Sequence, residues 1–356
     1  MKTRNGLPKY VLTAAAVVLA SLLSFASVSS NSAQGPMTGE WIIEMKPGTD
    51  LVYFSIHRRG ERGGNYSSSS NIRADSLKGL SAAQVSGSGS AVSLQIVREA
   101  GTFNCEGWFK EGKGSGSFTF EPNQRFAAEM RSLGYEQLSD EKLFAMAVHD
   151  IGLTFIRELN ALGCDHLTTD NLFAMRIHGA GPEFIKAMKA EGYDQVPVDN
   201  LVAMRIHGVR PEFIGELKTL GYEHPPLDQL VAMRIHGVST EFVKGLQEQG
   251  YRQPPIDQLI AMRIHGVKNE FIQELKELGY ERIPIDQLVA MRIHGVRTEF
   301  VKEIKALGFD RVPPDQLVAM RIHGVSPEFI QKARSRGYND ASIEQLIELK
   351  IRGLDR

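Results

Sequence analysis

The sequence has little of several features that would indicate a familiar class of protein. It contains two cysteines and two tryptophans in 356 residues, and its 41 basic residues are balanced by 42 acidic ones. Two cysteines exclude a fold held by several disulfides. A net charge of −1 gives no reason to expect a nucleic-acid partner. Apolar residues (42%) and charged residues (23%) have globular proportions, and the length indicates two or more structural units.

Only one stretch combines length, apolar character and a lack of charge, and it lies near the N-terminus. Basic residues among the first nine precede the uncharged residues 10–26, and small polar residues follow. This order is typical of a secretory signal. We predict a signal peptide at residues 1–29, with an uncleaved signal anchor as the alternative, and a linker at 30–36. The expected location is the periplasm or cell envelope, with membrane contact only through such an anchor.

The segment 37–122 has the alternation of a small antiparallel β domain, as a sheet or a partly closed barrel. Strands are expected at 40–46, 51–59, 91–100, 102–110 and 116–122, with a short helical turn at 76–84. The candidate core aromatics are Trp41, Trp108, Phe103, Phe109, Phe118 and Phe120.

A basic, glycine-containing segment interrupts this domain. Arg58, Arg59 and Arg62 precede two glycines and four consecutive serines. Guanidinium groups and loop N–H groups can bind an anion, so these arginines form a candidate anion loop. The alternative is a mobile hairpin loop without a ligand.

Residues 123–356 repeat with a period of 29, in about eight units. The Met–Arg–Ile–His string occurs six times, at 175–178, 204–207, 233–236, 262–265, 291–294 and 320–323. Related units stand at both ends, where Asp150 replaces a glycine in the first unit. Atypical terminal units are a common property of repeat arrays.

One unit illustrates the predicted local structure. Glycines at 237 and 250 each end a helical stretch, and a hydrophobic residue follows each of them. In such a helix end the glycine has φ > 0, and the next residue pairs with the residue five positions earlier. This predicts pairing of Val238 with Met233 and of Tyr251 with Leu246. Helices this short need neighbours, so we predict an α-solenoid of helix pairs and, for the whole chain, an α+β multidomain protein.

The repeated methionines and histidines allow two interpretations. Both are metal ligands, so a copper or zinc array is one hypothesis. However, adjacent helices lie ~8–10 Å apart, whereas two nitrogens on one zinc lie ~3–3.5 Å apart. The preferred interpretation is core packing for methionine and a helix-end position for histidine, so we predict no metal site and no cofactor. Cys105 and Cys164 could form one disulfide or stay buried thiols.

The repeated arginines form the candidate partner face. They are Arg176, Arg205, Arg234, Arg263, Arg292 and Arg321. Such a row can bind acidic partner segments, or it can pair within the array with the repeated acidic residues, such as Asp228 and Glu241 in one unit. No nucleophile–base set, phosphate loop or dinucleotide motif is present, so an enzyme is not expected.

The repeat text, for example LVAMRIHGVSTEFVKGLQEQGY, resembles short helical repeats of exported, acidobacterial-type proteins. Similar repeats are appended to beta-lactam-sensor-type membrane metallopeptidases, and the β segment resembles a domain that accompanies them. The zinc-protease motif is missing here, so no peptidase activity carries over. The resemblance implies an envelope location and a sensing or binding accessory role.

The leading hypothesis is a non-enzymatic exported scaffold that binds a protein or peptide partner. The alternative is a module for a small ligand or anion, centred on the β domain, and the third hypothesis is the metal-binding array.

Overall fold

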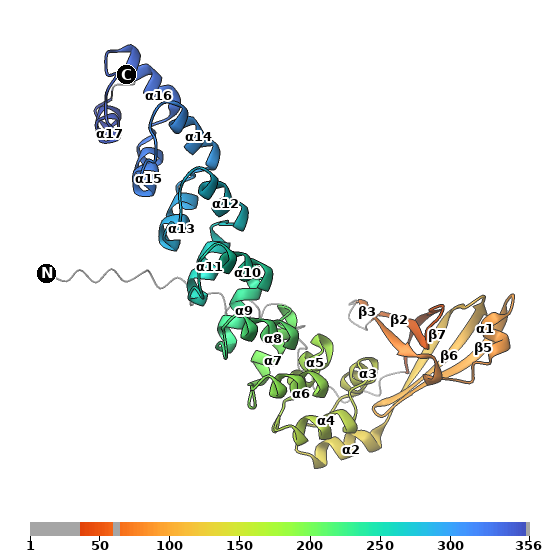
Figure 1. Cartoon of the computed structure of the whole chain (residues 1–356). Helices are drawn as coiled ribbons and strands as arrows, with labels where there is room; N and C mark the ends of the chain where they lie inside the picture. Colours follow the sequence, from red (N-terminus) through yellow and green to blue (C-terminus); the bar gives the residue numbers. More distant parts are fainter. Residues whose placement is uncertain (1–35, 60–64, 354–356) are drawn as a thin grey trace.

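The computed structural model describes residues 36–59 and 65–353. The predicted signal peptide and Arg62 lie outside this part of the chain. A seven-stranded antiparallel sheet comes first, and a long series of helices follows it (Figure 1). The α+β class is therefore confirmed.

The sheet is curled and has the strand order β3-β2-β1-β7-β6-β5-β4. The strands are β1 (Met37–Met45), β2 (Leu51–Arg59), β3 (Asn65–Arg73), β4 (Leu77–Lys78), β5 (Ser90–Arg98), β6 (Gly101–Lys110) and β7 (Lys113–Pro122). A 3-10 turn (Ala74–Ser76) precedes β4, and a short helix, α1 (Ala82–Ser86), precedes β5.

Five of these strands lie where the sequence predicts strands, and two were missed. β3 contains four serines and has polar residues on both faces, so it lacks the alternation that identifies a strand. Trp108 was wrongly assigned to the core, since it is 55% exposed. Phe103, Cys105 and Phe109 occupy odd positions of β6 and are buried, whereas Trp108 occupies an even position on the opposite face.

A helix completes the core of the sheet. Phe144, in α3 (Asp140–Val148), packs among Phe103, Phe118 and Phe120 with ring centroids 5.2–6.1 Å apart. Arg58 donates two hydrogen bonds to Glu141 of the same helix, at 2.7 and 2.8 Å. The sheet and the first helices therefore share one hydrophobic core, which the sequence had divided into two parts.

The helices alternate between two rows. The even row contains α2 (Gln124–Ser132), α4 (Leu153–Ala161), α6 (Pro182–Ala190), α8 (Pro211–Thr219), α10 (Thr240–Glu248), α12 (Asn269–Glu277), α14 (Thr298–Ala306) and α16 (Pro327–Ser335). The odd row contains α3, α5 (Thr169–His178), α7 (Val198–Ile206), α9 (Leu227–Ile235), α11 (Ile256–Ile264), α13 (Ile285–Ile293), α15 (Pro314–His323) and α17 (Ile343–Ile351).

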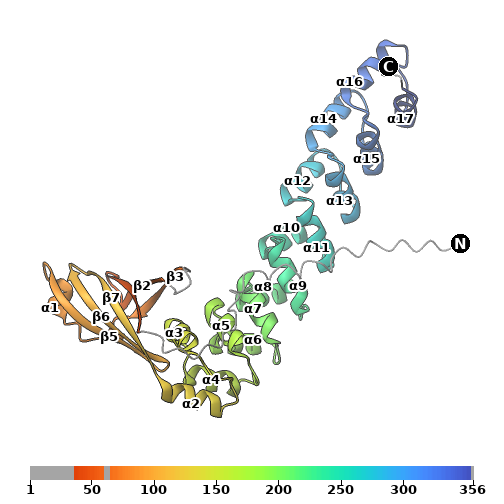
Figure 2. The same ribbon diagram turned by 180° about the vertical axis from the view of Figure 1, so that it is seen from behind.

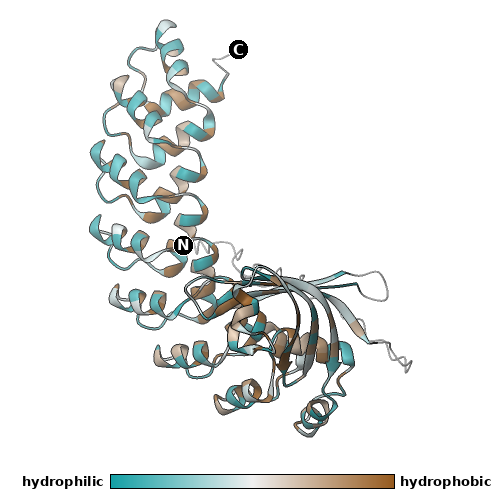
Figure 3. Cartoon of the chain, turned by 90° about the vertical axis from the view of Figure 1, so that its right-hand side faces the viewer, coloured by the Kyte–Doolittle hydropathy of each residue, from teal (hydrophilic) through white to brown (hydrophobic). Residues whose placement is uncertain are grey.

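Neighbours in a row pack against each other. In the odd row every helix from α5 to α17 contacts the next one, and the even row repeats this from α8 to α16. Both rows can be followed away from the sheet in Figures 1 and 2. Polar and apolar segments alternate along the helices in Figure 3, because each helix buries only part of its surface. In the described residues, no helix has the length and apolar character needed to cross a membrane.

The predicted helix ends are confirmed. Gly237 and Gly250 have φ of 70° and 94°. The N–H of Val238 donates to the carbonyl of Met233 at 2.8 Å, and Tyr251 donates to Leu246 at 2.9 Å. These bonds satisfy carbonyls that the helix leaves unpaired, which explains why glycine recurs at both positions of every unit after the first, where Asp150 takes one of the two places.

Candidate functional site

The repeated arginines connect each unit to the preceding one. The guanidinium carbon of Arg234, from α9, lies 5.1 Å from the ring centroid of Phe213, in α8. All six arginines have the same relation to a phenylalanine of the preceding unit, at 5.1–5.2 Å. Stacking of a cation on an aromatic ring contributes roughly 0.5–1 kcal/mol where the pair is partly exposed.

Two of these side chains also cap the end of the preceding odd-row helix, whereas the buried Nε atoms of Arg234, Arg263 and Arg292 have no hydrogen-bond partner among the described residues. Arg176 donates through Nε to the carbonyl of His149 at 2.9 Å, and Arg205 donates to His178 at 3.3 Å. A positive group there interacts favourably with the negative end of the helix. A Cβ on Gly179 would lie 3.0 Å from the Arg205 guanidinium, so the glycine also makes room for the arginine.

This geometry corrects the predicted carboxylate pairing. Among the described residues, Arg176 is the one member of the arginine series with an ion pair within 4.0 Å, and its partner is Asp150. The other five stack on aromatic rings instead. Sequence spacing could not show this, because a phenylalanine and a glutamate stand close together at the start of the even-row helices that these arginines reach.

The even row has an equivalent contact. Lys189 and Lys218 donate through Nζ to the carbonyls of Leu162 and Glu191, 27 residues earlier, both at 2.9 Å. Gln247 makes the same contact with Leu220. In several units of each row, therefore, a side chain from the next unit caps the C-terminus of a helix.

The repeated methionines and histidines differ in their exposure to solvent. The methionines of the six strings, and Met146 at the same position of the first unit, are fully buried, whereas the histidines lie exposed or half-buried at helix ends. No group of three or more His, Cys, Asp or Glu in the described ranges is arranged to hold a metal ion. Cys105 and Cys164 are both buried free thiols, and burial raises the pKa of Cys105 to about 12.

The isoleucine of each repeat has an unexpected position. The sequence places this isoleucine in an apolar helical stretch, yet it is 39–64% exposed in the seven units that contain it, while the first unit has Val148 there. We call this series the isoleucine ladder; it comprises Ile177, Ile206, Ile235, Ile264, Ile293, Ile322 and Ile351. Single exposed apolar residues are ordinary, but a regular row of them indicates a contact surface.

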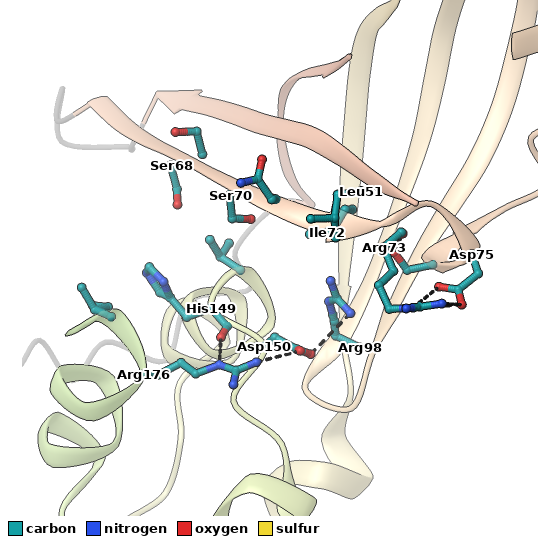
Figure 4. A pocket seen from close by; sticks show the side chains of 15 residues that line it. Leu51, Ser68, Ser70, Ile72, Arg73, Asp75, Arg98, His149, Asp150 and Arg176 are labelled. Carbon is teal, nitrogen blue, oxygen red and sulfur yellow. Dashed lines mark hydrogen bonds and ion pairs between the residues drawn. The ribbon is translucent and has the colours of Figure 1, made fainter. Parts of the chain in front are cut away.

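The ladder begins at a pocket between the sheet and the helices (Figure 4). The pocket has a volume of about 580 Å³ and lies between β3 on one side and the ends of α3 and α5 on the other. Arg98, His149, Asp150 and Arg176 line it together with Ile177. A volume of this size is within the usual range of ligand sites.

Two arginines share one carboxylate in this pocket. Arg176 contacts the Asp150 carboxylate at 2.9 Å and Arg98 contacts it at 3.4 Å. The Arg98 side chain is only 17% exposed, so its charge is poorly hydrated. The three groups together carry one net positive charge, which favours an anionic ligand.

His149 lies beside this cluster. Burial and the nearby Arg176 charge both disfavour the imidazolium, so they lower the pKa of His149 from its usual value of 6.5. Its Nε2 lies 3.4 Å from the hydroxyl oxygen of Tyr66, on β3. The ring therefore links the edge of the sheet to the first helices.

The structure does not bring the arginines of the predicted anion loop together in one site. Arg58 is committed to Glu141, and its side chain is 9% exposed. Arg59 is exposed at the end of β2, while Arg62 is outside the described residues. In the described part of the β domain, Arg98 and Arg73 line the pocket instead. No sequence pattern indicated this role for Arg98.

Asp150 was seen in the sequence only as an irregular terminal residue. It has φ of 54°, the left-handed conformation that glycine supplies in the other units. Its carboxylate forms ion pairs with both Arg98 and Arg176. An acidic residue in a position that otherwise requires glycine was the available signal for this site.

No known protein family matches the sequence, and no curated protein matches it either. The likeness to the repeats of exported bacterial proteins therefore rests on the repeat text alone.

Proposed function

We propose that the helical region is an α-solenoid and that the chain is a non-enzymatic exported scaffold for a protein or peptide partner. The isoleucine ladder carries this proposal. Burial of a fully exposed isoleucine side chain contributes about 1.5–3 kcal/mol, and because these isoleucines are 39–64% exposed, each one adds roughly half of that before the cost of association is subtracted. Seven such side chains in register supply enough apolar contact for a specific interface.

The arginine series borders the ladder, since each arginine immediately precedes an isoleucine. Stacking on phenylalanine fixes the guanidinium groups, and each arginine as a whole is exposed or half-buried. A fixed side chain loses little entropy when a partner binds. The proposed partner face therefore combines apolar contacts from isoleucine with donors from arginine.

The spacing of the ladder favours an extended partner. Neighbouring helices lie ~8–10 Å apart, and a polyproline II segment advances about 9 Å in one three-residue turn. An apolar side chain at every third position of such a segment would meet successive isoleucines. An α-helical partner rises about 5.4 Å per turn, so only every second turn, after about 10.8 Å, comes close to this spacing.

Export is part of the proposal and is supported by the N-terminal pattern of basic, apolar and small polar residues. The similarity of the repeats to those of exported bacterial proteins is a second, independent reason to expect the cell envelope.

Site-specific photocrosslinking tests the proposed face. A photoreactive phenylalanine analogue is placed at Ile235 or Ile264, and at the exposed Glu248 at the C-terminal end of α10 as the control, and the purified chain is irradiated in envelope extract. We expect one set of adducts from both ladder positions and none of them from Glu248. Equal adducts at all three positions, or none from the ladder, would reject the proposal.

A substitution provides the matched comparison. Changing Ile206 and Ile293 to Gln should abolish the adducts formed at Ile235 without lowering the thermal midpoint, because both side chains are exposed. Changing Glu248 and Glu277 to Gln, at the C-terminal ends of two even-row helices, should leave the adducts unchanged.

A further inference from the structure

β3 is a long edge strand. It pairs with β2 on one side and ends the strand order of the sheet. It has nine residues and contains neither proline nor lysine. The opposite edge is different, because β4 has only two residues, one of which is Lys78. Proteins commonly blunt an edge with a short strand or a lysine, and β3 has neither feature.

The free backbone groups of β3 can be assigned from the register. Ala74 donates to the carbonyl of Asp50 at 2.8 Å, so the pair formed by these two residues is hydrogen-bonded. Because bonded and non-bonded pairs alternate in an antiparallel ladder, residues 66, 68, 70 and 72 bond to β2. The N–H and C=O groups of Ser67, Ser69 and Asn71 therefore point away from β2. No hydrogen bond from another described residue reaches them.

This free edge borders the pocket between the sheet and the helices. Ser68, Ser70 and Ile72 lie on the pocket side of β3 in Figure 4, with Arg98 and Arg176 across from them. A chain added beside β3 would direct every second side chain into the pocket. The serines are small and leave room for such a chain. The two arginines that share Asp150 would favour an acidic side chain at one of these positions.

We propose that β3 takes up an extended, acidic segment of a partner protein as an eighth strand, with one carboxylate of that segment bound between Arg98 and Arg176. Backbone hydrogen bonds to Ser67, Ser69 and Asn71 supply affinity, and the arginine pair supplies specificity. This site adjoins the proposed partner face and shares Arg176 with it, but its affinity comes from the sheet edge and not from the isoleucine ladder. Either proposal can fail without the other.

A library of random twelve-residue peptides displayed on phage tests the site against the full chain. We expect enriched peptides rich in β-branched residues, with Asp or Glu at one fixed position. The Ser69→Pro variant should bind the best peptide at least tenfold more weakly, because proline removes an outward N–H without breaking the β2–β3 ladder. Ser69→Ala keeps that N–H and should change the affinity less than twofold.

The ligand itself gives a test that leaves the protein unchanged. N-methylation of alternate amides on one edge of the peptide should abolish binding, while methylation of the other edge should not. Arg98→Gln should weaken the acidic peptide at least fivefold and leave its amide analogue unaffected. Failure to enrich peptides, or equal binding by Ser69→Pro and the unchanged protein, would overturn the proposal.

Two other ligands of this site, a second copy of the chain and a small anion, are distinguished by further measurements. If sedimentation shows a dimer that Ser69→Pro dissociates, the edge belongs to a second copy of the chain and the proposal is wrong. It is also wrong if free acetate or inorganic phosphate binds the pocket as tightly as the peptide, since the added strand would then contribute nothing.

Discussion

The β domain and the helical series are held together over different distances along the chain. In the sheet, β1 pairs with β7, so the first and last strands of the domain lie side by side. In the helices, the capping contacts join residues 27 apart, and tyrosine hydroxyls such as that of Tyr222 donate to a carbonyl 32 residues ahead. Damage to the sheet should therefore affect the whole domain, whereas damage to a repeat should affect one unit and its neighbours.

The largest effect is expected where the two regions meet. Phe144→Ala removes the ring that contacts Phe103, Phe118 and Phe120, and such a change in a core costs about 3–5 kcal/mol of unfolding free energy. Both tryptophans lie in the sheet, so tryptophan fluorescence reports its unfolding, and far-ultraviolet circular dichroism reports mainly the helices. We expect the fluorescence transition in denaturant to shift most.

Phe329→Ala, in α16, is the matched control. Phe329 is also buried, but it belongs to the last helix pair. Its substitution should change the dichroism transition and leave the fluorescence transition in place. If either variant shifts both transitions equally, the sheet and the helices unfold as one unit and the comparison fails.

A smaller effect separates two glycines of the same array. Gly237 has φ of 70°, so alanine there costs about 1–2 kcal/mol. Its Cβ would also approach the Arg263 guanidinium at 3.5 Å. Gly215 lies inside α8, where an added methyl group would meet its nearest neighbour, the Glu191 carboxylate, at 3.8 Å. Alanine at this position should stabilise the helix by roughly 0.5–1 kcal/mol. Thermal unfolding followed by circular dichroism measures both, and equal shifts for the two variants would show that the helix end does not require glycine.

The sequence predicted the helical region better than the site. A period of 29 repeats the same environment several times, so Gly237, Val238 and Met233 could be assigned to a helix end together with their hydrogen bond. The stacking of Arg234 on Phe213 needed the distance between two helices, which one sequence does not contain. β3 lacked an apolar face, and the pocket joins Arg98 to Asp150 across 52 residues, so neither has a local pattern.

The smallest expected effect is a pH dependence of stability that arises where the sheet meets the first helices. The folded state lowers the pKa of His149 below 6.5 because the ring is buried beside Arg176, with Tyr66 as its polar neighbour. In the interval between that lowered value and 6.5, the unfolded chain binds more protons than the folded one. The contribution of His149 to stability is therefore complete above pH 6.5 and is lost as the pH falls through the folded-state pKa.

His149→Gln should remove this part of the acid dependence, measured as the denaturant midpoint of tryptophan fluorescence at a series of pH values. His265→Gln changes the same repeat position far from the pocket and should leave the profile of the unchanged protein. A profile that is identical in His149→Gln would mean that acidification acts elsewhere in the sheet. If His149→Gln changes the pH dependence of the fluorescence and dichroism midpoints equally, contacts between the sheet and the first helices couple the unfolding of the two regions. Phe144→Ala asks the same question with a much larger loss of unfolding free energy.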